Sequence, residues 1–179
     1  MANEQTAVFG GGCFWCVEAV FNRMTGVKTA VSGYMGGHVD KPMYRQVCGG
    51  DTGHVEVVQV TFDPSEVSFR DLLEGFFAVH DPTTLNRQGN DVGEQYRSVI
   101  FYTTEEQREQ AEQYIAGLET AKTFPQPIVT AVEPASTFYP AEDYHQEYYD
   151  NNRTQPYCQF VIAPKLHKFE KKFSQKMRA

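Results

Sequence analysis

Residues 6–16 read Thr6-Ala-Val-Phe-Gly-Gly-Gly-Cys-Phe-Trp-Cys16, and this stretch decides how the chain begins to fold. The apolar run before the glycines predicts a short strand over 6–9, and the residues from Cys13 onward predict a helix over about 13–24. Three glycines permit a tight turn and leave open space beside the next side chain. The stretch therefore predicts a strand and a helix joined by a turn, with the thiol of Cys13 at the start of the helix.

The rest of the chain continues this alternation of strands and helices. Hydrophobic patterning and turn signals predict strands at 27–32, 54–62, 96–102 and 128–132, and helices at 68–79, capped by Ser68, and at 104–121, opened by the capping-box pattern of Thr104 and Gln107. A Gly-rich loop at 33–53 and a polar loop at 80–95 separate them, and a loop as long as the second is usually functional or disordered. The aromatic segment 138–149 fits neither pattern. The order β-α-β-β-α-β, then α-β, predicts an α+β fold: a ferredoxin-like split βαβ core with an extra helix, an extra strand and a C-terminal extension.

Length and charge limit the classes of protein to consider. The 179 residues suit a single domain over 1–179, and the net charge of −7 argues against nucleic acid as a partner, because nucleic-acid binding needs a clustered basic face. The basic run from Lys165 to Arg178 carries Leu166, Phe169 and Phe173 at helical spacing, which predicts an amphipathic terminal helix. No stretch approaches the roughly 20 apolar residues of a membrane helix, and the first residues lack the pattern of a secretory signal. We therefore expect a cytoplasmic protein without membrane contact, and, since no apolar interface stretch stands out, a monomer.

Four cysteines, Cys13, Cys16, Cys48 and Cys158, indicate thiol chemistry or metal binding in a reducing compartment. At a helix N-terminus, free N–H groups and the helix dipole favour the thiolate of Cys13. Lowering an ordinary thiol pKa to near 7 requires about 2 kcal/mol, which is the upper limit of that effect. Burial by Phe14 and Trp15 opposes it. The thiolate therefore needs another hydrogen-bond donor, or forms fully only when substrate is bound.

Other interpretations of the cysteines stay open at this point. Two of them could be core residues, and Cys48 resembles a small buried hydrophobe. Cys13 and Cys16 could form half of a zinc site with Cys48 and His54 or His38, although the spacing is poor and a second C-x-x-C is missing. They could also be the dithiol of a thioredoxin-like disulfide oxidoreductase. The intervening pair, Phe14 and Trp15, suits the wall of a pocket for a methyl group on sulfur, or plain core packing.

Glu56 interrupts the apolar strand predicted at 54–62. Strand alternation places it on the same face as His54 and Val58. A carboxyl group among apolar side chains has a raised pKa and can hold a proton near neutrality, as a general acid must. The alternative is a glutamate on an edge strand that reaches water, and the sequence alone leaves both open. By themselves, Tyr44, Asp91 and Tyr96 match ordinary loop or strand-start residues.

Several segments together resemble the peptide methionine sulfoxide reductase A family. They are Gly11-Gly-Cys-Phe-Trp-Cys16, Cys48-Gly-Gly-Asp-Thr-Gly-His-Val-Glu56 and Asp81-Pro-Thr-Thr-Leu-Asn-Arg-Gln-Gly-Asn-Asp-Val-Gly-Glu-Gln-Tyr-Arg-Ser98, with support from Ser32-Gly-Tyr-Met-Gly-Gly37 and Ala141-Glu-Asp-Tyr-His-Gln146. The resemblance spans roughly residues 7–165. It implies a ferredoxin-like core and a cofactor-free enzyme that reduces the S epimer of methionine sulfoxide, free or in proteins.

The resemblance also implies roles for individual residues. Cys13 matches the nucleophile, and Phe14 and Trp15 match the walls of the pocket for the substrate's methyl group. Glu56 matches the acid that protonates the sulfoxide oxygen, while the residues that hydrogen-bond around that oxygen and a site water correspond to Tyr44, Asp91 and Tyr96. In such an enzyme the nucleophile becomes a sulfenic acid, a second thiol converts it to a disulfide, and thioredoxin reduces the disulfide.

Two positions depart from the common pattern of the family. Many members have Gly where this chain has Cys16, and Val55 replaces a common Ala. Cys158 lies where many members keep a C-terminal resolving cysteine, in a segment that we expect to be mobile. Cys16 is a second candidate for the resolving thiol, but in a helix its side chain would lie about one turn away from that of Cys13. We therefore expect Cys158 to be the resolving thiol and Cys16 to be the alternative.

Overall fold

The computed structural model describes residues 4–173, and the main strands and helices follow the predicted order. The strands are β1 (Gln5–Gly10), β2 (Val27–Met35), β3 (Val55–Phe62), β4 (Arg87–Gln88), β5 (Asp91–Val92), β6 (Val99–Tyr102), β7 (Ala131–Pro134) and β8 (Tyr139–Pro140). The α-helices are α1 (Phe14–Phe21), α2 (Tyr44–Cys48), α3 (Phe69–Val79), α4 (Glu105–Thr120), α5 (Tyr148–Asn151) and α6 (Ala163–Lys172). Short 3₁₀ turns cover Glu94–Tyr96 and Asp143–His145, and a π-helical turn covers Cys158–Ile162.

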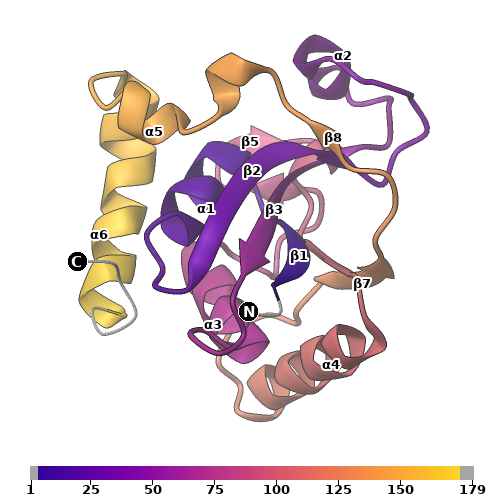
Figure 1. The fold of residues 1–179 in the computed structure, drawn as a ribbon, viewed down its shortest axis with the longest axis vertical. Coiled ribbons are helices and arrows are strands. Elements are labelled where there is room, and N and C mark those ends of the chain that lie inside the picture. Colours follow the sequence, from indigo (N-terminus) through magenta and orange to yellow (C-terminus); the bar gives the residue numbers. More distant parts are fainter. Residues whose placement is uncertain (1–3, 174–179) are drawn as a thin grey trace.

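The main sheet has the strand order β7-β6-β1-β3-β2-β8. Its four central strands pair antiparallel, with Ala7 opposite Val60 and Tyr34 opposite Glu56. That arrangement is the split βαβ unit, so the predicted α+β ferredoxin-like core is confirmed. Strand β7 extends one edge parallel to β6, after the extra helix α4, and β8 extends the other edge antiparallel to β2 (Figure 1).

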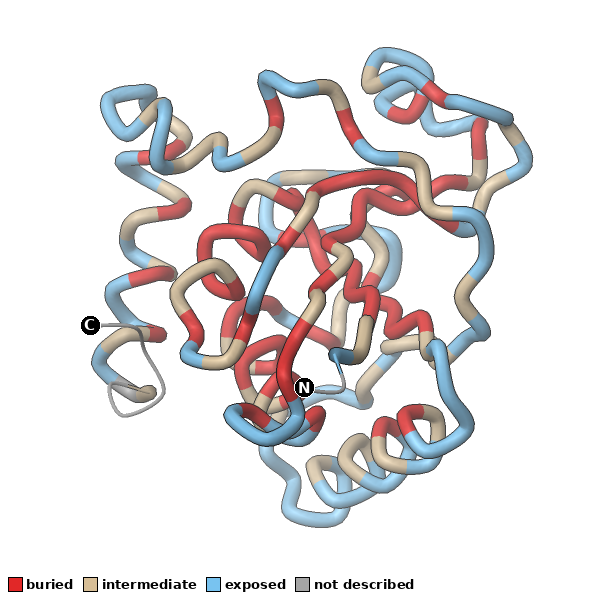
Figure 2. Tube along the Cα trace, in the orientation of Figure 1, coloured by how far each residue is buried: buried red, intermediate tan, exposed pale blue. Residues whose placement is uncertain are grey.

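The main hydrophobic core lies between one face of the sheet and the helices. It unites Phe9, Val58, Val60 and Phe62 of the strands with Phe14, Val17 and Phe21 of α1 and Leu72, Leu73 and Phe76 of α3. A smaller cluster covers the opposite face and includes Val8, Met35, Val55, Val57, Val99 and Phe101. Figure 2 shows the buried residues concentrated in the central strands and α1. The first four residues of β3, residues 55–58, are buried on both faces of the sheet, so a charged residue among them must be desolvated.

The structure corrects the predicted bounds where elements are short. The supposed loop 33–53 contains the end of β2 and the helix α2, and the supposed loop 80–95 contains the β4–β5 hairpin. Strand β6 begins at Val99 rather than at 96, and β7 begins at Ala131 rather than at 128. Elements of two to five residues are too short to show a period, which is why the pattern did not reveal them.

Helix caps were predicted more accurately. Ser68 caps α3 as expected, accepting a hydrogen bond from Asp71 N at 3.0 Å. Thr104 caps α4 by accepting from Gln107 N, but the Gln107 side chain accepts from Thr103 N instead of completing the box with Thr104. The capping box at α4 is therefore only half formed.

The C-terminal segment is helical and packed on the core. Leu166 and Phe169 of α6 are buried, as the predicted amphipathic helix requires, and the part of that prediction beyond 173 lies outside the described residues. The segment around Cys158, expected to be mobile, forms the π-helical turn that leads into α6. Within residues 4–173, no helix is both long and apolar enough to cross a membrane.

Candidate active site

The turn between β1 and α1 holds Cys13 at the N-cap of the helix. Gly12 has a φ of +85°, and a Cβ on it would lie 2.6 Å from Gln88 Cγ, so only glycine fits there. This close contact packs the 81–91 loop against the turn. Cys13 itself has extended dihedrals (φ −64°, ψ 128°) and is 8% exposed. The thiol therefore stands at the edge of the core, just outside the helix.

Burial dominates the ionisation of Cys13. It raises the pKa of the thiol well above its usual value, and the nearby charges of Glu56, Cys16 and Asp91 raise it further, against one hydrogen bond from the Trp15 backbone that lowers it. The helix N-terminus does not compensate for this desolvation. In the free protein at neutral pH Cys13 is therefore a thiol. Of the two expectations from the sequence, an additional hydrogen-bond donor or a thiolate that forms only when substrate is bound, the second agrees better with this structure.

Glu56 is a buried acid in the middle of the sheet. Strand β3 lies between β1 and β2, and Glu56 is 1% exposed, so the edge-strand alternative is wrong. Its Oε1 accepts the Phe14 N–H at 3.2 Å, and Oε2 has no hydrogen-bond partner among residues 4–173. Burial raises the pKa of Glu56 to about 8, although the bond from Phe14 lowers it. At neutral pH the group holds a proton, and Oε2 is the oxygen free to donate it.

Trp15 is held in place by aromatic and hydrogen-bond contacts. Its indole Nε1 donates to His145 Nδ1 at 3.0 Å, and its ring stacks on Tyr148 with centroids 3.7 Å apart. Tyr157 packs edge-on against the same ring. Phe14, which is fully buried, contacts Tyr44 and His145 at centroid distances of 6.3 and 5.2 Å. The rings of Phe14 and Trp15 both contact His145, which joins them in one aromatic layer beside Cys13.

Two tyrosines and one aspartate complete the surroundings of the thiol. Burial, with the charge of Glu56 next, raises the pKa of both Tyr44 and Tyr96, so both keep their hydroxyl protons and can donate hydrogen bonds. Asp91 accepts the Tyr157 hydroxyl at 2.9 Å, and its charge acts on Cys13 and Glu56. All seven residues singled out around the reactive thiol thus come together: Cys13, Phe14, Trp15, Tyr44, Glu56, Asp91 and Tyr96.

The other three cysteines occupy different environments. Cys16 and Cys158 are buried together in a small cluster with Ala19 and Ile162. Cys48 is exposed at the end of α2, so its interpretation as a small buried hydrophobe is wrong. The helix α2 is a single surface turn that buries only Val47, which leaves the Cys48 thiol to hydrogen-bond with Tyr44. All four cysteines are free thiols.

The residues of the alternative zinc site are not assembled. His54 accepts the Gly37 N–H at Nδ1, and its Nε2 lies 2.7 Å from Val39 O, so both ring nitrogens are engaged with the backbone. Among the described residues, no group of three or more His, Cys, Asp or Glu side chains could hold a metal ion.

Sequence reasoning missed the residues that support the site from the 142–157 segment. His145 is buried, and its pKa is lowered by that burial, so the neutral ring accepts the Trp15 N–H at Nδ1 and keeps its own proton on Nε2. Glu142 accepts from the Tyr34 hydroxyl and the Tyr44 backbone N–H. The only available signal was the segment 141–146, which contributed to the family resemblance but had no periodicity.

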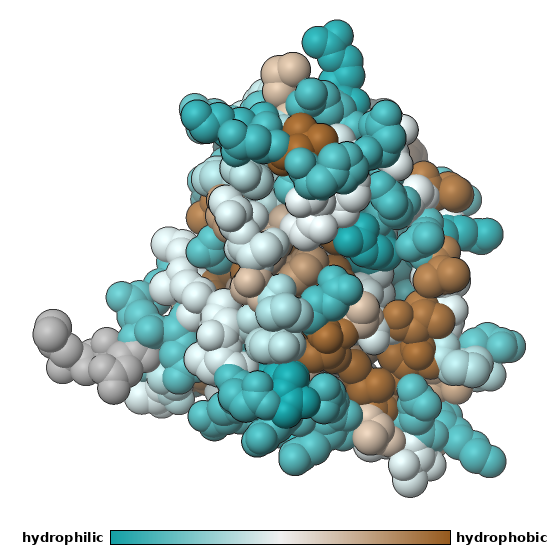
Figure 3. All heavy atoms as spheres, turned by 90° about the vertical axis from the view of Figure 1, so that its right-hand side faces the viewer, coloured by the Kyte–Doolittle hydropathy of each residue, from teal (hydrophilic) through white to brown (hydrophobic). Residues whose placement is uncertain are grey.

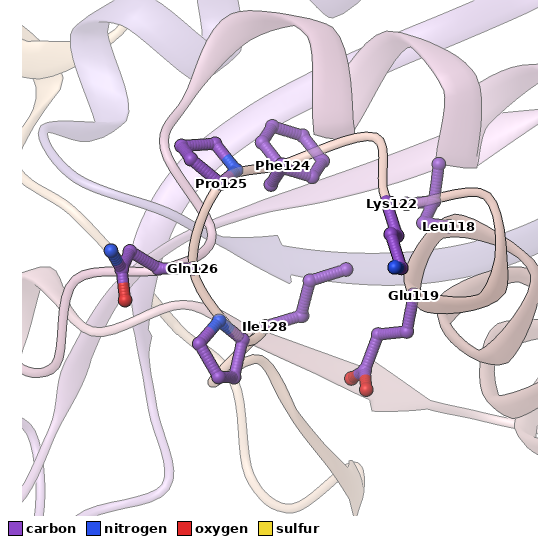
Figure 4. Close-up of a pocket in the computed structure, with 8 residues that line it drawn as sticks. Leu118, Glu119, Lys122, Phe124, Pro125, Gln126 and Ile128 are labelled. Carbon is purple, nitrogen blue, oxygen red and sulfur yellow. The ribbon is translucent and has the colours of Figure 1, made fainter.

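Surface hollows also lie away from these residues. The space-filling view of the side that carries α2, α4 and β7 shows apolar atoms in patches between hydrophilic ones (Figure 3). One pocket of about 260 Å³ lies between the end of α4 and the loop that follows, lined by Leu118, Phe124, Pro125 and Ile128 (Figure 4). Its charged residues are Glu119 and Lys122, and it contains none of the thiols, so it is not the reactive site.

Comparison with known proteins agrees with this geometry. A family model described as peptide methionine sulfoxide reductase matches residues 5–177. A protein of Chromobacterium violaceum named peptide methionine sulfoxide reductase MsrA is 59% identical over 170 residues, which make up 95% of this chain and 97% of that protein.

Solved structures show the same fold. Mxr1 from Saccharomyces cerevisiae in its reduced form has a TM-score of 0.79 at 34% identity, covering 87% of this chain and 89% of that one. Mxr1 in complex with Trx2 has a TM-score of 0.56 at 22% identity, covering 81% and 84%.

Proposed function

Because the chain belongs to the peptide methionine sulfoxide reductase family, and is therefore an enzyme that reduces methionine sulfoxide, we propose a role for each residue around Cys13. One observation carries this proposal. A carboxyl group with a pKa of about 8 lies buried beside a buried thiol. The turn that carries this thiol also carries an ordered aromatic pair. A proton donor, a nucleophile and an apolar wall are what the reduction of a methyl sulfoxide needs.

The first step joins Cys13 to the sulfoxide. The Phe14–Trp15 layer receives the methyl group, and the Cys13 sulfur attacks the sulfoxide sulfur while Glu56 Oε2 gives its proton to the oxygen. The Tyr44 and Tyr96 hydroxyls donate to the oxygen as negative charge develops there. The oxygen then passes from the substrate sulfur to the Cys13 sulfur and the bond between the two sulfurs breaks. Methionine leaves, Cys13 is a sulfenic acid, and the proton lost by the thiol restores Glu56. A site with one fixed wall and one fixed donor accepts one epimer, which the family resemblance assigns as S.

A second thiol completes the catalytic cycle. Cys158, or alternatively Cys16, attacks the sulfenic acid to form a disulfide with Cys13 and release water. A thioredoxin then reduces the disulfide by thiol exchange, which the complex of the yeast protein Mxr1 with Trx2 supports. The enzyme itself needs no metal or organic cofactor, because thiols supply both electrons.

The state of the thiols also bears on the compartment in which the reaction takes place. Four free cysteines and a thioredoxin-type reductant fit a reducing compartment such as the cytoplasm. We place the reaction on a monomer with one catalytic domain over residues 1–179, since the site draws on elements from β1 to the π-helical turn of a single chain.

A coupled assay tests the proposed function. Thioredoxin, thioredoxin reductase and NADPH are supplied with the separate S and R epimers of N-acetyl-methionine sulfoxide. We expect NADPH oxidation with the S epimer alone, its loss in Cys13→Ser, and its retention in Cys48→Ser, the matched change at the exposed thiol. Turnover of neither epimer, in a protein that still reduces insulin disulfides, would instead indicate a general disulfide oxidoreductase.

A further inference from the structure

Helix α2, which carries Tyr44, has few attachments of its own. It is a helix of five residues at the periphery of the molecule (Figure 1), it buries only Val47, and its N-cap residue, Met43, makes no side-chain cap. A helix of this length is not stable by itself, because a single turn does not offset the cost of helix nucleation. The position of Tyr44 therefore depends on bonds that reach α2 from other parts of the chain.

One carboxylate supplies such a bond. Glu142 Oε2 accepts the Tyr44 N–H at 3.0 Å, across 98 positions of sequence, and thereby takes the place of the missing cap. Its Oε1 accepts the hydroxyl of Tyr34 at 2.9 Å. Tyr34 is fully buried in β2, opposite Glu56 of β3. Glu142 thus ties the start of α2 to the strand that pairs with the one bearing the acid.

Glu142 is charged when it makes these two bonds. Partial burial acts to raise the pKa of Glu142, but the hydrogen bonds to its carboxylate, first among them the one from Tyr44 N, lower the pKa below its usual value overall. At neutral pH the group is therefore a carboxylate with one acceptor oxygen for each of two donors. Hydrogen bonds to a charged acceptor are stronger than those between neutral groups, so the clamp on α2 is a firm one.

The ring of Tyr44 contacts the aromatic layer beside Cys13. Its centroid lies 4.3 Å from that of His145 and 6.3 Å from that of Phe14. After burial, the charge of Glu56 is the largest cause of the raised pKa of Tyr44, so the hydroxyl lies within electrostatic range of the acid. A shift of α2 would therefore move this hydroxyl relative to both the aromatic layer and the acid.

Glu142 also supports the wall of the site, but through its backbone. Its carbonyl accepts the His145 N–H at 2.9 Å in the 3₁₀ turn Asp143–His145, and His145 in turn accepts the Trp15 indole N–H. Substitution of the Glu142 side chain leaves that carbonyl in place. The hold on Tyr44 and the support of the wall are therefore separable by mutation.

From this arrangement we propose that Glu142 is a positioning residue of the reductase, whose carboxylate fixes Tyr44 so that the tyrosine hydroxyl donates to the sulfoxide oxygen. The inference rests on the proposed function, in which Tyr44 is one of two such donors. In this role Glu142 acts through Tyr44 and not on the substrate. Because a reacting group misplaced by about 1 Å costs up to roughly a hundredfold in rate, the clamp matters for the chemical step rather than for substrate binding.

Single-turnover kinetics test this role. Fully reduced enzyme is mixed with increasing concentrations of the S epimer of N-acetyl-methionine sulfoxide, without reductant, and methionine release is followed by rapid acid quench. We expect Glu142→Ala to slow the maximal rate by about ten- to a hundredfold and to change the half-saturating concentration by less than about threefold. Glu142→Gln, which keeps one acceptor oxygen, should lie between Glu142→Ala and wild type. Asp143→Asn, a change at the neighbouring exposed carboxylate, should match wild type.

A double-mutant cycle with Tyr44→Phe separates positioning from a general loss of structure. Glu142→Ala and Tyr44→Phe should each slow methionine release. The double variant should be within about twofold of Tyr44→Phe alone, because the clamp then has no donor to hold. The fluorescence of Trp15, the single tryptophan of the chain, should be unchanged in Glu142→Ala, because the backbone support of His145 remains.

The positioning role is overturned if Glu142→Ala releases methionine at the wild-type rate, or if its effect multiplies with that of Tyr44→Phe. A changed Trp15 fluorescence in Glu142→Ala would also overturn it, since the variant would then act on the wall of the site. Wild-type enzyme that releases no methionine would instead contradict the proposed function, so the two failures are distinguishable.

Discussion

The proton held by Glu56 is the residue-scale property on which the chemistry depends. Burial in β3 raises its pKa to about 8, and the Phe14 N–H engages one oxygen only. Below that pH the group is neutral and can protonate the sulfoxide oxygen. Above it, the carboxylate has no proton to give, and its charge opposes a thiolate at Cys13.

We expect Glu56→Gln to slow methionine release in a single turnover by roughly ten- to a thousand-fold, because the amide keeps the shape but cannot transfer a proton. The ratio of the wild-type rate to the Glu56→Gln rate should be largest below pH 8 and shrink above it, because wild-type Glu56 loses its proton there and its charge then opposes a thiolate at Cys13. Rapid quench across this pH range measures both. Glu133→Gln, an exposed strand residue, is the control and should leave the rate unchanged. A rate ratio near one, or one independent of pH, would remove Glu56 from the role of acid.

At this scale, prediction succeeded where the immediate neighbours in sequence determine the environment. The apolar residues on either side of Glu56 indicated a raised pKa, while the sequence alone left an edge-strand glutamate open as the alternative. Cys48 was misjudged because its exposure depends on α2 lying at the surface, and His145 was missed because its partner, Trp15, is 130 residues away in the sequence.

At the scale of elements, one side chain extends an edge of the sheet. The Gln146 amide accepts from Ser32 N at 3.0 Å and donates to Ser32 O at 2.9 Å, as a paired strand residue would. Next to it, buried Glu18 of α1 accepts from Glu147 N at 2.6 Å and from the Ser32 hydroxyl. These bonds tie the segment that carries His145 and Tyr148 to β2 and α1.

Gln146→Ala should lower the free energy of unfolding by about 1 kcal/mol and speed hydrogen exchange in residues 143–151, because Ser32 N loses its acceptor. Urea denaturation and exchange mass spectrometry provide the two measurements. Gln159→Ala, an exposed glutamine on the same C-terminal segment, should change neither. Equal stability of the two variants would show that the amide bridge does not hold the segment.

Long elements were predictable from the sequence because they show a full period, as α3 and β3 do. The β4–β5 hairpin and α2 were not, since their conformation depends on tertiary contacts such as the close packing of Gln88 on Gly12. Through the same contact the loop 80–95, which the sequence predicted to be functional or disordered, is ordered and forms part of the wall of the site.

At the scale of the molecule, the site is assembled at one end of the sheet by segments far apart in sequence. The β1–α1 turn supplies the thiol and β3 the acid. The surrounding hydroxyls and aromatic rings come from α2, from the turn Glu94–Tyr96 after β5 and from the 142–158 segment. The order of elements predicted this core, while the family resemblance predicted which residues meet. The resemblance alone did not predict that Cys16 and Cys158 are buried together, because that depends on how the Cys158–Ile162 turn packs against α1.

The most direct test of the central claim, that Cys13 takes the sulfoxide oxygen, uses the Cys16→Ser/Cys158→Ser double variant. One equivalent of the S epimer of N-acetyl-methionine sulfoxide is added, and intact-protein and peptide mass spectrometry follow. We predict one methionine per chain and one added oxygen atom located on Cys13. Absence of methionine, or an oxygen located on Cys48, would contradict the assignment.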